Sequence, residues 1–471
     1  MAVYLSISAD KSTVIQKSLH EILSPEHLLE VARRVGLLKR LKEFNAADYL
    51  LTAISFCMLS PKEREYRLVR FSQRYNEKHG TSLDPKNIHN QLRKPQMLEF
   101  TSAITREIIA LTANTLKVKR SELMSDELGA LLEKLGVKDI ILIDGVEMTL
   151  YPGCIDNFEC KGKGRKHTDG TEAKPGLKLH VAFSLCKMTF EYIQVTEACG
   201  NEKEQVLPER FHNCLLIMDR GYVADTLEDR ISSTNRNKFL IKGKHNMAGT
   251  VLKAYDVNGR LRPKYTGRKV SQLPKHLHLD LDVKLRNGQV IRVIQHVKTK
   301  SRNNTSPVTI LRTNIPRRSI DLNQLFLIYR LRWQVELYAK CLKSGNSLQS
   351  INSEILSVIL SFINISMLSS MCKNYFGIMA KLKRGIACLS ILKLNCTAFV
   401  FAEAILKISV VSRNTRTQIF KKLFDFIESN CCRTSPGKRD LRLLKDLPSL
   451  IKKIVSMNNI RVVKMLNTLG M

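Results

Sequence analysis

Two short apolar runs, each ending in an aspartate, limit the folds open to this chain more than any other feature. The first run is Asp139–Asp144 and the second is Cys214–Asp219. Apolar residues at consecutive positions, instead of at every second one, are typical of strands covered on both faces. A short helical stretch and another predicted strand, Phe239–Lys242, follow the second run. This alternation predicts an α/β sheet with its functional site at the strand ends.

A β-rich segment is predicted after these strands, between residues 245 and 316. Leu277–Leu285 alternates strictly between apolar and polar residues, and Val290–Val297 continues as a second strand. Asn287 and Gly288 between them are the residues that a type I′ hairpin turn requires. Further strands are predicted at Leu177–Leu185, Thr189–Val195 and Val308–Leu311.

The charge of the chain indicates a polyanionic partner. It has 471 residues, and its 76 Lys and Arg against 43 Asp and Glu give a net charge of +33. Hydrophobic residues make up 44%, which is enough for a large core and excludes a wholly disordered chain. Ribosomal and membrane-surface proteins can be this basic but rarely combine such charge with so large a core. Nucleic acid is therefore the expected partner.

Three further features of the sequence indicate where in the cell the protein is located. The 12 cysteines lack the spacing of zinc sites, which indicates reduced thiols in a cytosolic protein. The first residues contain no basic segment followed by an apolar one, so no signal peptide is expected. The stretch Ile355–Met371 is apolar but interrupted by Asn364 and several serines, and we expect a buried helix there instead of a membrane span.

Residues 1–130 are predicted to be helical. Ser24 and Pro25 form a helix start, as N-cap and first helical residue, and Ala46–Leu59 is apolar enough for a core helix. The stretch Lys86–Pro95 fits a helix-turn-helix unit. Two interpretations remain open for this region: a domain that binds DNA ends, and a helical bundle with a solvated basic face.

A loop rich in glycine and charge lies between the first predicted strand and the next one along the chain. A phosphate backbone would order such a loop, and the alternative is a loop that only increases solubility. Its basic residues are Lys161, Lys163, Arg165, Lys166 and His167.

The stretch Tyr329–Lys343 contains neither glycine nor proline and is predicted to be one helix. Tyr329, Arg332, Glu336 and Lys343 follow one another at steps of 3, 4 and 7 residues. At about 100° per residue, their side chains fall within a sector of about 60° on one side of a helix. A phenol, a guanidinium, a carboxylate and an ammonium lined up in this way suit a face that handles phosphate groups.

The two strand-end aspartates suggest a metal site. If their strands are adjacent, the carboxylates of Asp144 and Asp219 repel each other, and a divalent cation relieves that repulsion. Oxygen ligands favour Mg²⁺ or Mn²⁺, and two such ions about 3.5–4 Å apart would assist phosphodiester cleavage. Glu336 is the candidate third carboxylate. Asp139 competes with Asp144 for the first position, but it begins the strand instead of ending it.

Three other residues are expected to have structural roles. Asp280 and Asp282 lie on the polar face of the predicted hairpin, so we expect them to be solvent-facing charges and not catalytic groups. Trp333 is expected to pack the Tyr329–Lys343 helix against the sheet. The alternative for Trp333 is stacking on a nucleic-acid base.

The combined pattern resembles a known family. Tyr329-x2-Arg332-x3-Glu336-x6-Lys343 matches the Tyr-x2-Arg-x3-Glu-x6-Lys signature of bacterial DDE-type insertion-sequence transposases of the insertion sequence four family. The block Asp219–Tyr222 is similar to the residues around their second aspartate, and Arg332 to Glu336 is similar to their Arg-Trp-x-hydrophobic-Glu core. The resemblance covers roughly residues 25 to 350.

The resemblance implies a DNA transposase with a ribonuclease-H-like catalytic core that a β-rich insertion interrupts. Asp144, Asp219 and Glu336 would be catalytic and would bind Mg²⁺ or Mn²⁺. In relatives, a metal-activated water nicks the element at its terminal inverted repeats, a DNA hairpin forms and reopens, and the 3′ end is joined to target DNA. Relatives commonly have a hydroxyl residue where this chain has Val146. The residues expected to bind DNA are Tyr329, Arg332, Lys343, Arg220, Lys242 and Lys244.

Five regions are expected on this basis. They are a helical N-terminal DNA-binding region (1–130), the first part of the core (131–244), the β-rich insertion (245–316), the second part of the core with the Glu336 helix (317–372) and a basic helical C-terminal region (373–471). The expected partners are double-stranded DNA, at the element ends and the target, and a second copy of the chain in the synaptic complex. The expected location is the bacterial cytoplasm, at the nucleoid and without a membrane. Two alternatives stay open: an inactive or domesticated sequence-specific DNA-binding protein, and a stand-alone nuclease of the same fold.

Overall fold

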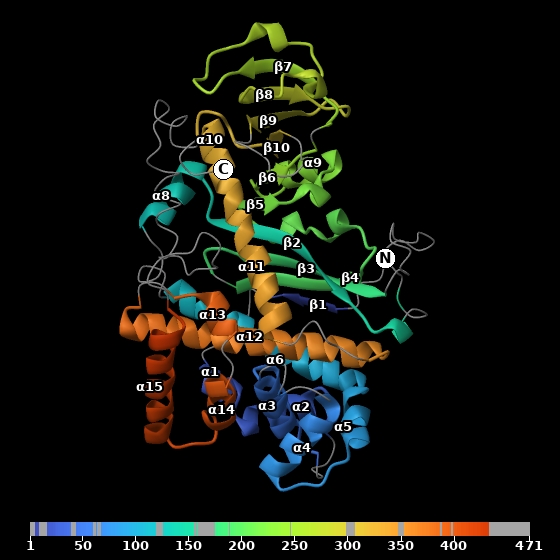
Figure 1. Ribbon diagram of the computed structural model, residues 1–471, viewed down its shortest axis with the longest axis vertical. Coiled ribbons are helices and arrows are strands. Elements are labelled where there is room, and N and C mark those ends of the chain that lie inside the picture. Colours follow the sequence, from blue (N-terminus) through green and yellow to red (C-terminus); the bar gives the residue numbers. More distant parts are fainter. Residues whose placement is uncertain are drawn as a thin grey trace.

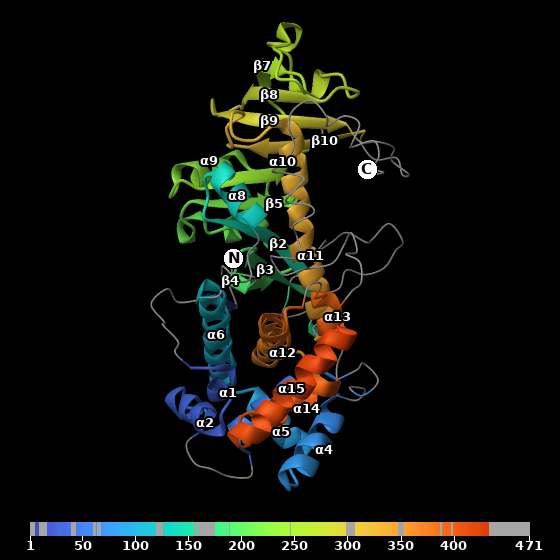
Figure 2. The same cartoon turned by 90° about the vertical axis from the view of Figure 1, so that its left-hand side faces the viewer.

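The computed structural model describes residues 5–8, 17–38, 44–59, 63, 67–118, 126–154, 158, 175–187, 189–244, 246–297, 307–346, 353–386, 389–396 and 399–432. The predicted basic loop at Lys161–His167 and the basic region beyond residue 432 lie outside these ranges. Within them, one long mixed sheet runs through the molecule, and most helices gather at one end of it (Figures 1 and 2).

The sheet combines antiparallel and parallel pairing. In the described part of the chain it has ten strands in the order β1-β4-β3-β2-β5-β6-β10-β9-β8-β7. β2, β3 and β4 pair antiparallel, whereas β2, β5 and β6 pair parallel. The predicted mixture of strands and helices is thus confirmed. The strands are β1 (Leu5–Ser8), β2 (Asp139–Thr149), β3 (Gly176–Ser184), β4 (Thr189–Glu197), β5 (Cys214–Met218), β6 (Lys238–Lys242), β7 (Thr250–Tyr255), β8 (Leu279–Lys284), β9 (Val290–Val297) and β10 (Val308–Thr313).

β2 is longer than its apolar run predicts. It continues past Asp144 because β3 pairs with it as far as Thr149. Its parallel pairing with β5 stops earlier, at Leu142 and Ile217. Asp144 therefore lies within β2, beyond the last parallel pair, and the prediction that it ends the strand is wrong.

The β-rich segment extends the core sheet instead of forming a separate one. β8 and β9 form the predicted hairpin, and β10 joins β9 to core strand β6. The predicted type I′ turn is wrong, because such a turn needs positive φ at both central residues. Only Gly288 has a positive φ, of 86°, and the amide of Gly288 donates to the carbonyl of Leu285. This is a three-residue turn in which glycine takes the left-handed position.

The polar face of the hairpin is also covered, contrary to our expectation for Asp280. Its side chain is 5% exposed and accepts two hydrogen bonds from the guanidinium of Arg292, of 3.0 and 2.7 Å. Arg317 donates to both Asp280 and Asp282. The loop after β10 covers this face, since Arg292 also donates to the carbonyls of Ile315 and Ile320. Asp280 is thus a buried ion-pair residue, and Asp282 is a half-buried one.

The N-terminal region is mostly helical, but β1 is an exception to the prediction. Leu5 and Ile7 are buried, and β1 pairs antiparallel with β4 at the sheet edge. The predicted helix start is confirmed, because the Ser24 hydroxyl accepts a 3.2 Å hydrogen bond from the amide of His27. The helices are α1 (Leu19–Ile22), α2 (Pro25–Arg34), α3 (Ala46–Cys57), α4 (Arg67–His79), α5 (Pro85–Leu92), α6 (Pro95–Val118), α8 (Asp126–Leu135), α9 (Asp225–Ser233), α10 (Leu322–Tyr329), α11 (Trp333–Lys340), α12 (Leu356–Arg384), α13 (Ile391–Cys396), α14 (Phe399–Lys407) and α15 (Arg413–Asn430).

α12 connects the two ends of the chain. It contacts α3 and α6 from the N-terminal region and α13 and α15 from the C-terminal one (Figure 1). Of the described helices, it alone is long and apolar enough to cross a membrane, but 83% of its most apolar window is buried inside the protein. The buried helix predicted at Ile355–Met371 is therefore confirmed. The expected boundary between residues 372 and 373 falls inside this helix.

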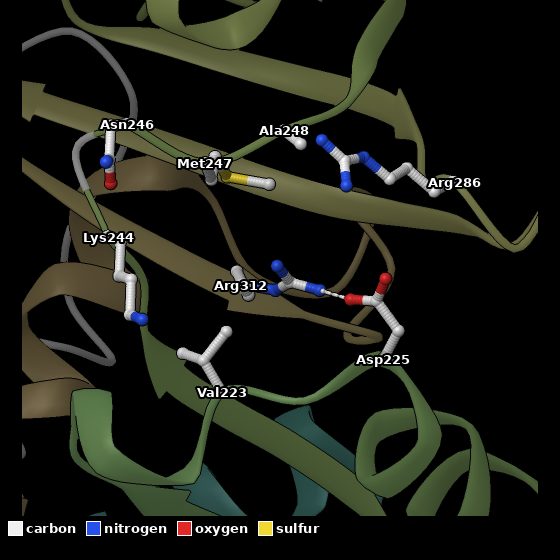
Figure 3. A pocket seen from close by; sticks show the side chains of 8 residues that line it. All are labelled: Val223, Asp225, Lys244, Asn246, Met247, Ala248, Arg286 and Arg312. Atoms are coloured by element: carbon white, nitrogen blue, oxygen red, sulfur yellow. Dashed lines mark hydrogen bonds and ion pairs between the residues drawn. The ribbon is translucent and has the colours of Figure 1, made fainter.

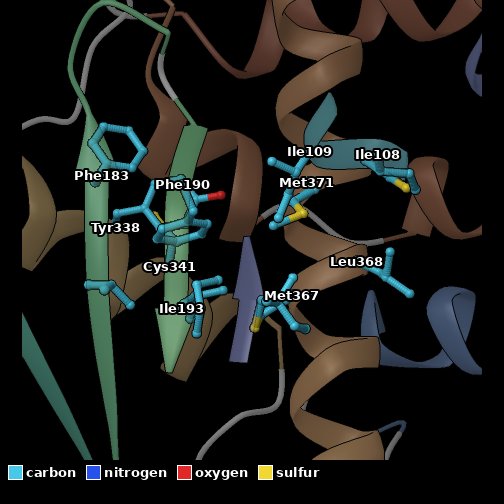
Figure 4. Packing of buried hydrophobic residues seen from close by; sticks show 14 of the residues in the cluster. Ile108, Ile109, Phe183, Phe190, Ile193, Tyr338, Cys341, Met367, Leu368 and Met371 are labelled. Atoms are coloured by element: carbon cyan, nitrogen blue, oxygen red, sulfur yellow. The ribbon is translucent and has the colours of Figure 1, made fainter. Parts of the chain in front are cut away.

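Aromatic packing fixes α11 against the sheet. The Tyr338 ring lies 5.2 Å from that of Phe183 on β3 and 4.8 Å from that of Phe190 on β4, measured between centroids. Met367 and Met371 of α12 belong to the same hydrophobic core as these rings (Figure 4). Because α11 also contacts β2, this packing holds the helix beside the strand that carries Asp144.

Candidate active site

The first two predicted acids lie level with each other at the point where β2 and β5 separate. The parallel register pairs Asp139 with Cys214 and Leu142 with Ile217. The same offset sets Asp144 level with Asp219, just past the end of β5. The sheet therefore brings together the two carboxylates that the sequence placed after apolar runs.

The third acid, Glu336, comes from a helical segment that is not one uniform α-helix as predicted. α10 ends at Tyr329, Arg330–Arg332 form a 3₁₀ turn, α11 follows, and Cys341–Gly345 form a π-helical turn. A 3₁₀ turn and a π turn each change the rotation per residue, so the sector of about 60° does not apply. The segment still directs Glu336 toward Asp144, as the contacts of Arg332 demonstrate.

Arg332 lies between two of the acids. Its Nη1 is 3.7 Å from Oδ2 of Asp144, and its Nη2 forms an ion pair with Oε1 of Glu336. The Arg332 side chain is only 12% exposed. In this structure the guanidinium therefore neutralises the carboxylates, although the sequence predicted that it holds DNA.

Asp219 has its own partners. The Tyr329 hydroxyl donates a 3.1 Å hydrogen bond to Oδ1 of Asp219, and Nζ of Lys242 lies 4.0 Å from the same oxygen. Tyr329 is only 9% exposed. Its hydroxyl therefore bonds to Asp219 inside the protein and is not presented at the surface. Three of the four signature residues, Tyr329, Arg332 and Glu336, thus contact one another's partners at the acids.

The two aspartates differ in acidity. The pKa of Asp144 is raised to about 6, chiefly by burial and also by the charges of Glu336 and Asp219, while Arg332 opposes the shift. For Asp219, burial also raises the pKa, but the backbone of Arg220 and the charges of Arg332 and Lys242 together lower it below its usual value. Asp219 is therefore ionised at neutral pH, and Asp144 is the acid that most needs a cation.

Comparison with known proteins agrees with this geometry. Residues 135–369, which contain all three acids, match the family model described as transposase DDE domain. This segment is similar to the DDE domain of transposases. The chain is 22% identical over 382 residues to the transposase for insertion sequence element IS231F of Bacillus thuringiensis subsp. israelensis, covering 72% of this chain and 74% of that protein. It is also 22% identical over 474 residues to the transposase for IS231B of Bacillus thuringiensis subsp. berliner, covering 89% and 92%.

Domains of the DDE transposase family generally use divalent metal ions. The donor set fits such an ion, because three carboxylates offer the oxygen ligands that Mg²⁺ and Mn²⁺ prefer. Among the residues described, however, no group of three His, Cys, Asp or Glu side chains converges closely enough to hold a metal. Arg332 supplies positive charge to Asp144 and Glu336 instead.

The last signature residue of the transposase domain, Lys343, lies in the π-helical turn and is half-buried. A buried polar network holds this turn: the amide of Asn346 donates to the carbonyl of Cys341 and to Oδ1 of Asn395. Nζ of Lys373 donates to the carbonyl of Gly345, 3.2 Å away. The network fixes the path of the chain at Lys343, as expected of a π turn at a functional site.

Two other predicted DNA-binding residues, Arg220 and Lys244, are exposed. Lys244 lines a pocket of about 330 Å³ between the core and the β-rich segment (Figure 3). Arg286 and Arg312 also line this pocket, and Nη2 of Arg312 lies 2.6 Å from Oδ1 of Asp225. Of the predicted basic residues, Arg332 and Lys242 therefore lie at the acids, whereas Lys244 lies at this pocket.

The structure bears on two alternatives that the sequence left open. Asp139 is buried at the start of β2, where it accepts hydrogen bonds from the Ser184 hydroxyl and the amide of Cys186, so it has a structural role away from the acids. Trp333 is 40% exposed. This exposure is larger than we expected for a side chain that packs the helix against the sheet.

Sequence reasoning missed Glu202, Lys178 and Tyr222, which lie beside the acids. The sequence signal that could have pointed to these residues was a glycine one or two positions after each aspartate, namely Gly145 and Gly221. Their significance becomes apparent only when the three-dimensional neighbours of the two glycines are known.

Proposed function

We propose that this protein is a transposase that cuts an insertion sequence at its terminal inverted repeats and joins the 3′ ends to target DNA. The observation that carries the proposal is that Asp144 lies level with Asp219 on the sheet while Arg332 links Asp144 to Glu336. The signature from Tyr329 to Lys343 supports membership of the insertion sequence four family.

We also propose that the catalytic core is ribonuclease-H-like. The strand order β4-β3-β2-β5-β6, antiparallel on one side of β2 and parallel on the other, supports this. The five expected regions, including the β-rich insertion at 245–316, remain part of the proposal.

In the proposed mechanism, Asp144, Asp219 and Glu336 hold Mg²⁺ or Mn²⁺. When bound, these ions activate water and stabilise the leaving oxygen of the cut phosphodiester. Tyr329 orients Asp219 through its hydrogen bond, and Lys242 stabilises the charged form of that acid. Arg332 limits repulsion among the acids and is close enough to the cluster to contact a scissile phosphate.

DNA would lie across the exposed basic side chains. Lys244, Arg220 and the exposed Trp333 are proposed to contact it, together with Lys343. A second copy of the chain in the synaptic complex, and a location at the nucleoid in the bacterial cytoplasm, follow as further parts of the proposal.

Binding to DNA is expected to weaken steeply with salt. A chain of net charge +33 would neutralise several phosphates and release their counterions. With six or more phosphate contacts, affinity falls about 10³-fold between roughly 50 and 200 mM salt. Fluorescence anisotropy with a labelled duplex measures this, and an affinity that is the same at both salt concentrations contradicts the proposed DNA interface.

Replacing Trp333 by alanine is expected to weaken DNA binding with little effect on folding. The side chain is 40% exposed, so its loss leaves the core intact. Loss of one stacking contact costs about 1–3 kcal/mol, roughly 5- to 150-fold in affinity. Trp333→Phe should retain part of the affinity, and unchanged binding by Trp333→Ala excludes stacking.

One experiment tests the proposed function against its alternatives. The full chain is incubated with Mg²⁺ and a DNA duplex that carries the inverted repeats flanking its gene, and with a second DNA as target. A transposase cuts at the repeat ends and joins them to the target. Cutting without joining or end preference supports a stand-alone nuclease, and binding without cutting supports an inactive DNA-binding protein.

A further inference from the structure

Glu202 lies against both glycines that follow the proposed metal-binding aspartates. It begins the short 3₁₀ turn Glu202–Gln205, which packs on the turn Arg220–Tyr222. A Cβ atom placed on Gly145 would lie 3.1 Å from Oε1 of Glu202, and one placed on Gly221 would overlap Oε2. Neither glycine has a positive φ, so backbone conformation does not require glycine at these positions. The lack of side chains there is what admits the Glu202 carboxylate.

A buried lysine holds this carboxylate in place. Nζ of Lys178 lies 2.8 Å from Oε1 of Glu202 and 3.5 Å from Oε1 of Glu147, and the Lys178 side chain is only 6% exposed. Lys178 is on β3, in register with Glu147 on β2. Because the lysine neutralises Glu202, the carboxylate can lie close to two further acids without strong repulsion.

A third group completes the cluster. Tyr222 is 1% exposed, and no hydrogen-bond partner of its hydroxyl is found in the described part of the chain. The charges of Glu202, Asp144 and Asp219 are among those that act on this hydroxyl. A buried donor without an acceptor, among three carboxylates, is suited to donate to a molecule bound at the site.

We propose that Glu202 is a positioning residue that sets the spacing of Asp144 and Asp219 for a divalent cation. It does so by filling the space beside Gly145 and Gly221, with Lys178 holding its charge. The Tyr222 hydroxyl stabilises an oxygen atom of the bound water or DNA. This inference rests on the proposed function, since it assigns Glu202 to the same metal site.

Variants can separate this role from a structural one. Glu202→Gln keeps the size of the side chain but loses the ion pair with Lys178 that holds it in place. Lys178 retains Glu147, so the fold is expected to persist. Gly221→Ala adds a methyl group that displaces the Glu202 carboxylate without removing it. Loss of a residue that orients metal ligands typically lowers metal affinity about 10- to 100-fold. We expect a loss in that range for each variant, at an unchanged thermal unfolding midpoint.

The measurement is Mn²⁺ binding to the full chain by electron paramagnetic resonance, together with the Mn²⁺ concentration that gives half-maximal DNA cleavage. Glu204→Gln, on the same turn but exposed, is the matched control. If Gly221→Ala acts through Glu202, the double variant Gly221→Ala/Glu202→Ala binds Mn²⁺ as Glu202→Ala alone does.

The possible failures are distinguishable. One outcome overturns the inference and leaves the proposed function standing. In it the parent protein cuts DNA, and Glu202→Gln and Gly221→Ala have the same Mn²⁺ affinity as Glu204→Gln. Additive losses in the double variant also overturn it. A parent that neither binds Mn²⁺ nor cuts DNA overturns the proposed function, and the inference with it.

Discussion

Cleavage of element-end DNA is expected to fall by about 10³-fold or more when Asp219 is replaced by asparagine or Glu336 by glutamine, because each change removes the charge of a proposed metal ligand, worth several kcal/mol. The amides have nearly the size of the acids, so folding should be maintained. Affinity for DNA should also be retained, since loss of a negative charge does not weaken contact with phosphate. Asp144→Asn is expected to behave in the same way.

The matched control is Asp229→Asn, which makes the same chemical change at an exposed position of α9. Single-turnover cleavage and duplex binding are measured on each variant. Full cleavage by Asp219→Asn and Glu336→Gln would show that these acids do not form the catalytic centre.

Replacing Arg312 by methionine is expected to lower the free energy of unfolding by about 3–5 kcal/mol, because it leaves a buried carboxylate without its cation. Arg312 is 3% exposed and donates to Oε2 of Glu228 from Nε and Nη2, at 3.0 and 2.8 Å. Glu228 is fully buried on α9. The pair joins α9 to β10, where the β-rich segment meets the core.

The decrease in the free energy of unfolding caused by Arg312→Met should depend on pH. Burial raises the pKa of Glu228 from 4.5 to about 7 even though Arg312 opposes the shift, so removing Arg312 raises it further. At pH values between 4.5 and the pKa of folded Glu228, this side chain holds a proton in the folded state that it has released in the unfolded state. The free energy of unfolding therefore falls as pH rises. Urea unfolding of Arg312→Met should show a larger deficit at pH 8 than at pH 5. The double variant Arg312→Met/Glu228→Gln should recover part of it, and a deficit below about 1 kcal/mol at pH 8 contradicts the role of the pair.

The sequence predicted the site well where one local pattern determines the outcome. Consecutive apolar residues identified β2 and β5, and a polar residue directly after each run identified Asp144 and Asp219. The parallel register then set the two acids level, which no local pattern encodes. The predicted type of the turn after β8 was wrong because Asn287 and Gly288 suit two turn types. The number of loop residues decides between these types.

Roles that depend on long-range contacts were not predictable. Arg332 pairs with Asp144 from a distant strand, and Asp280 is buried because a later loop covers the hairpin. Glu202 lies beside two glycines from different strands, and this proximity exists only in the folded chain.

The most direct test of the shared metal site is Fe²⁺-directed cleavage of the protein itself. Fe²⁺ binds oxygen ligands that also bind Mg²⁺, and with ascorbate and peroxide it generates radicals that cut the backbone nearby. We expect cuts in three separate segments, around Asp144, Asp219 and Glu336, which Mg²⁺ suppresses and Asp219→Asn abolishes. Cuts confined to other parts of the chain, or a pattern unchanged in Asp219→Asn, would contradict a metal site formed by these three acids.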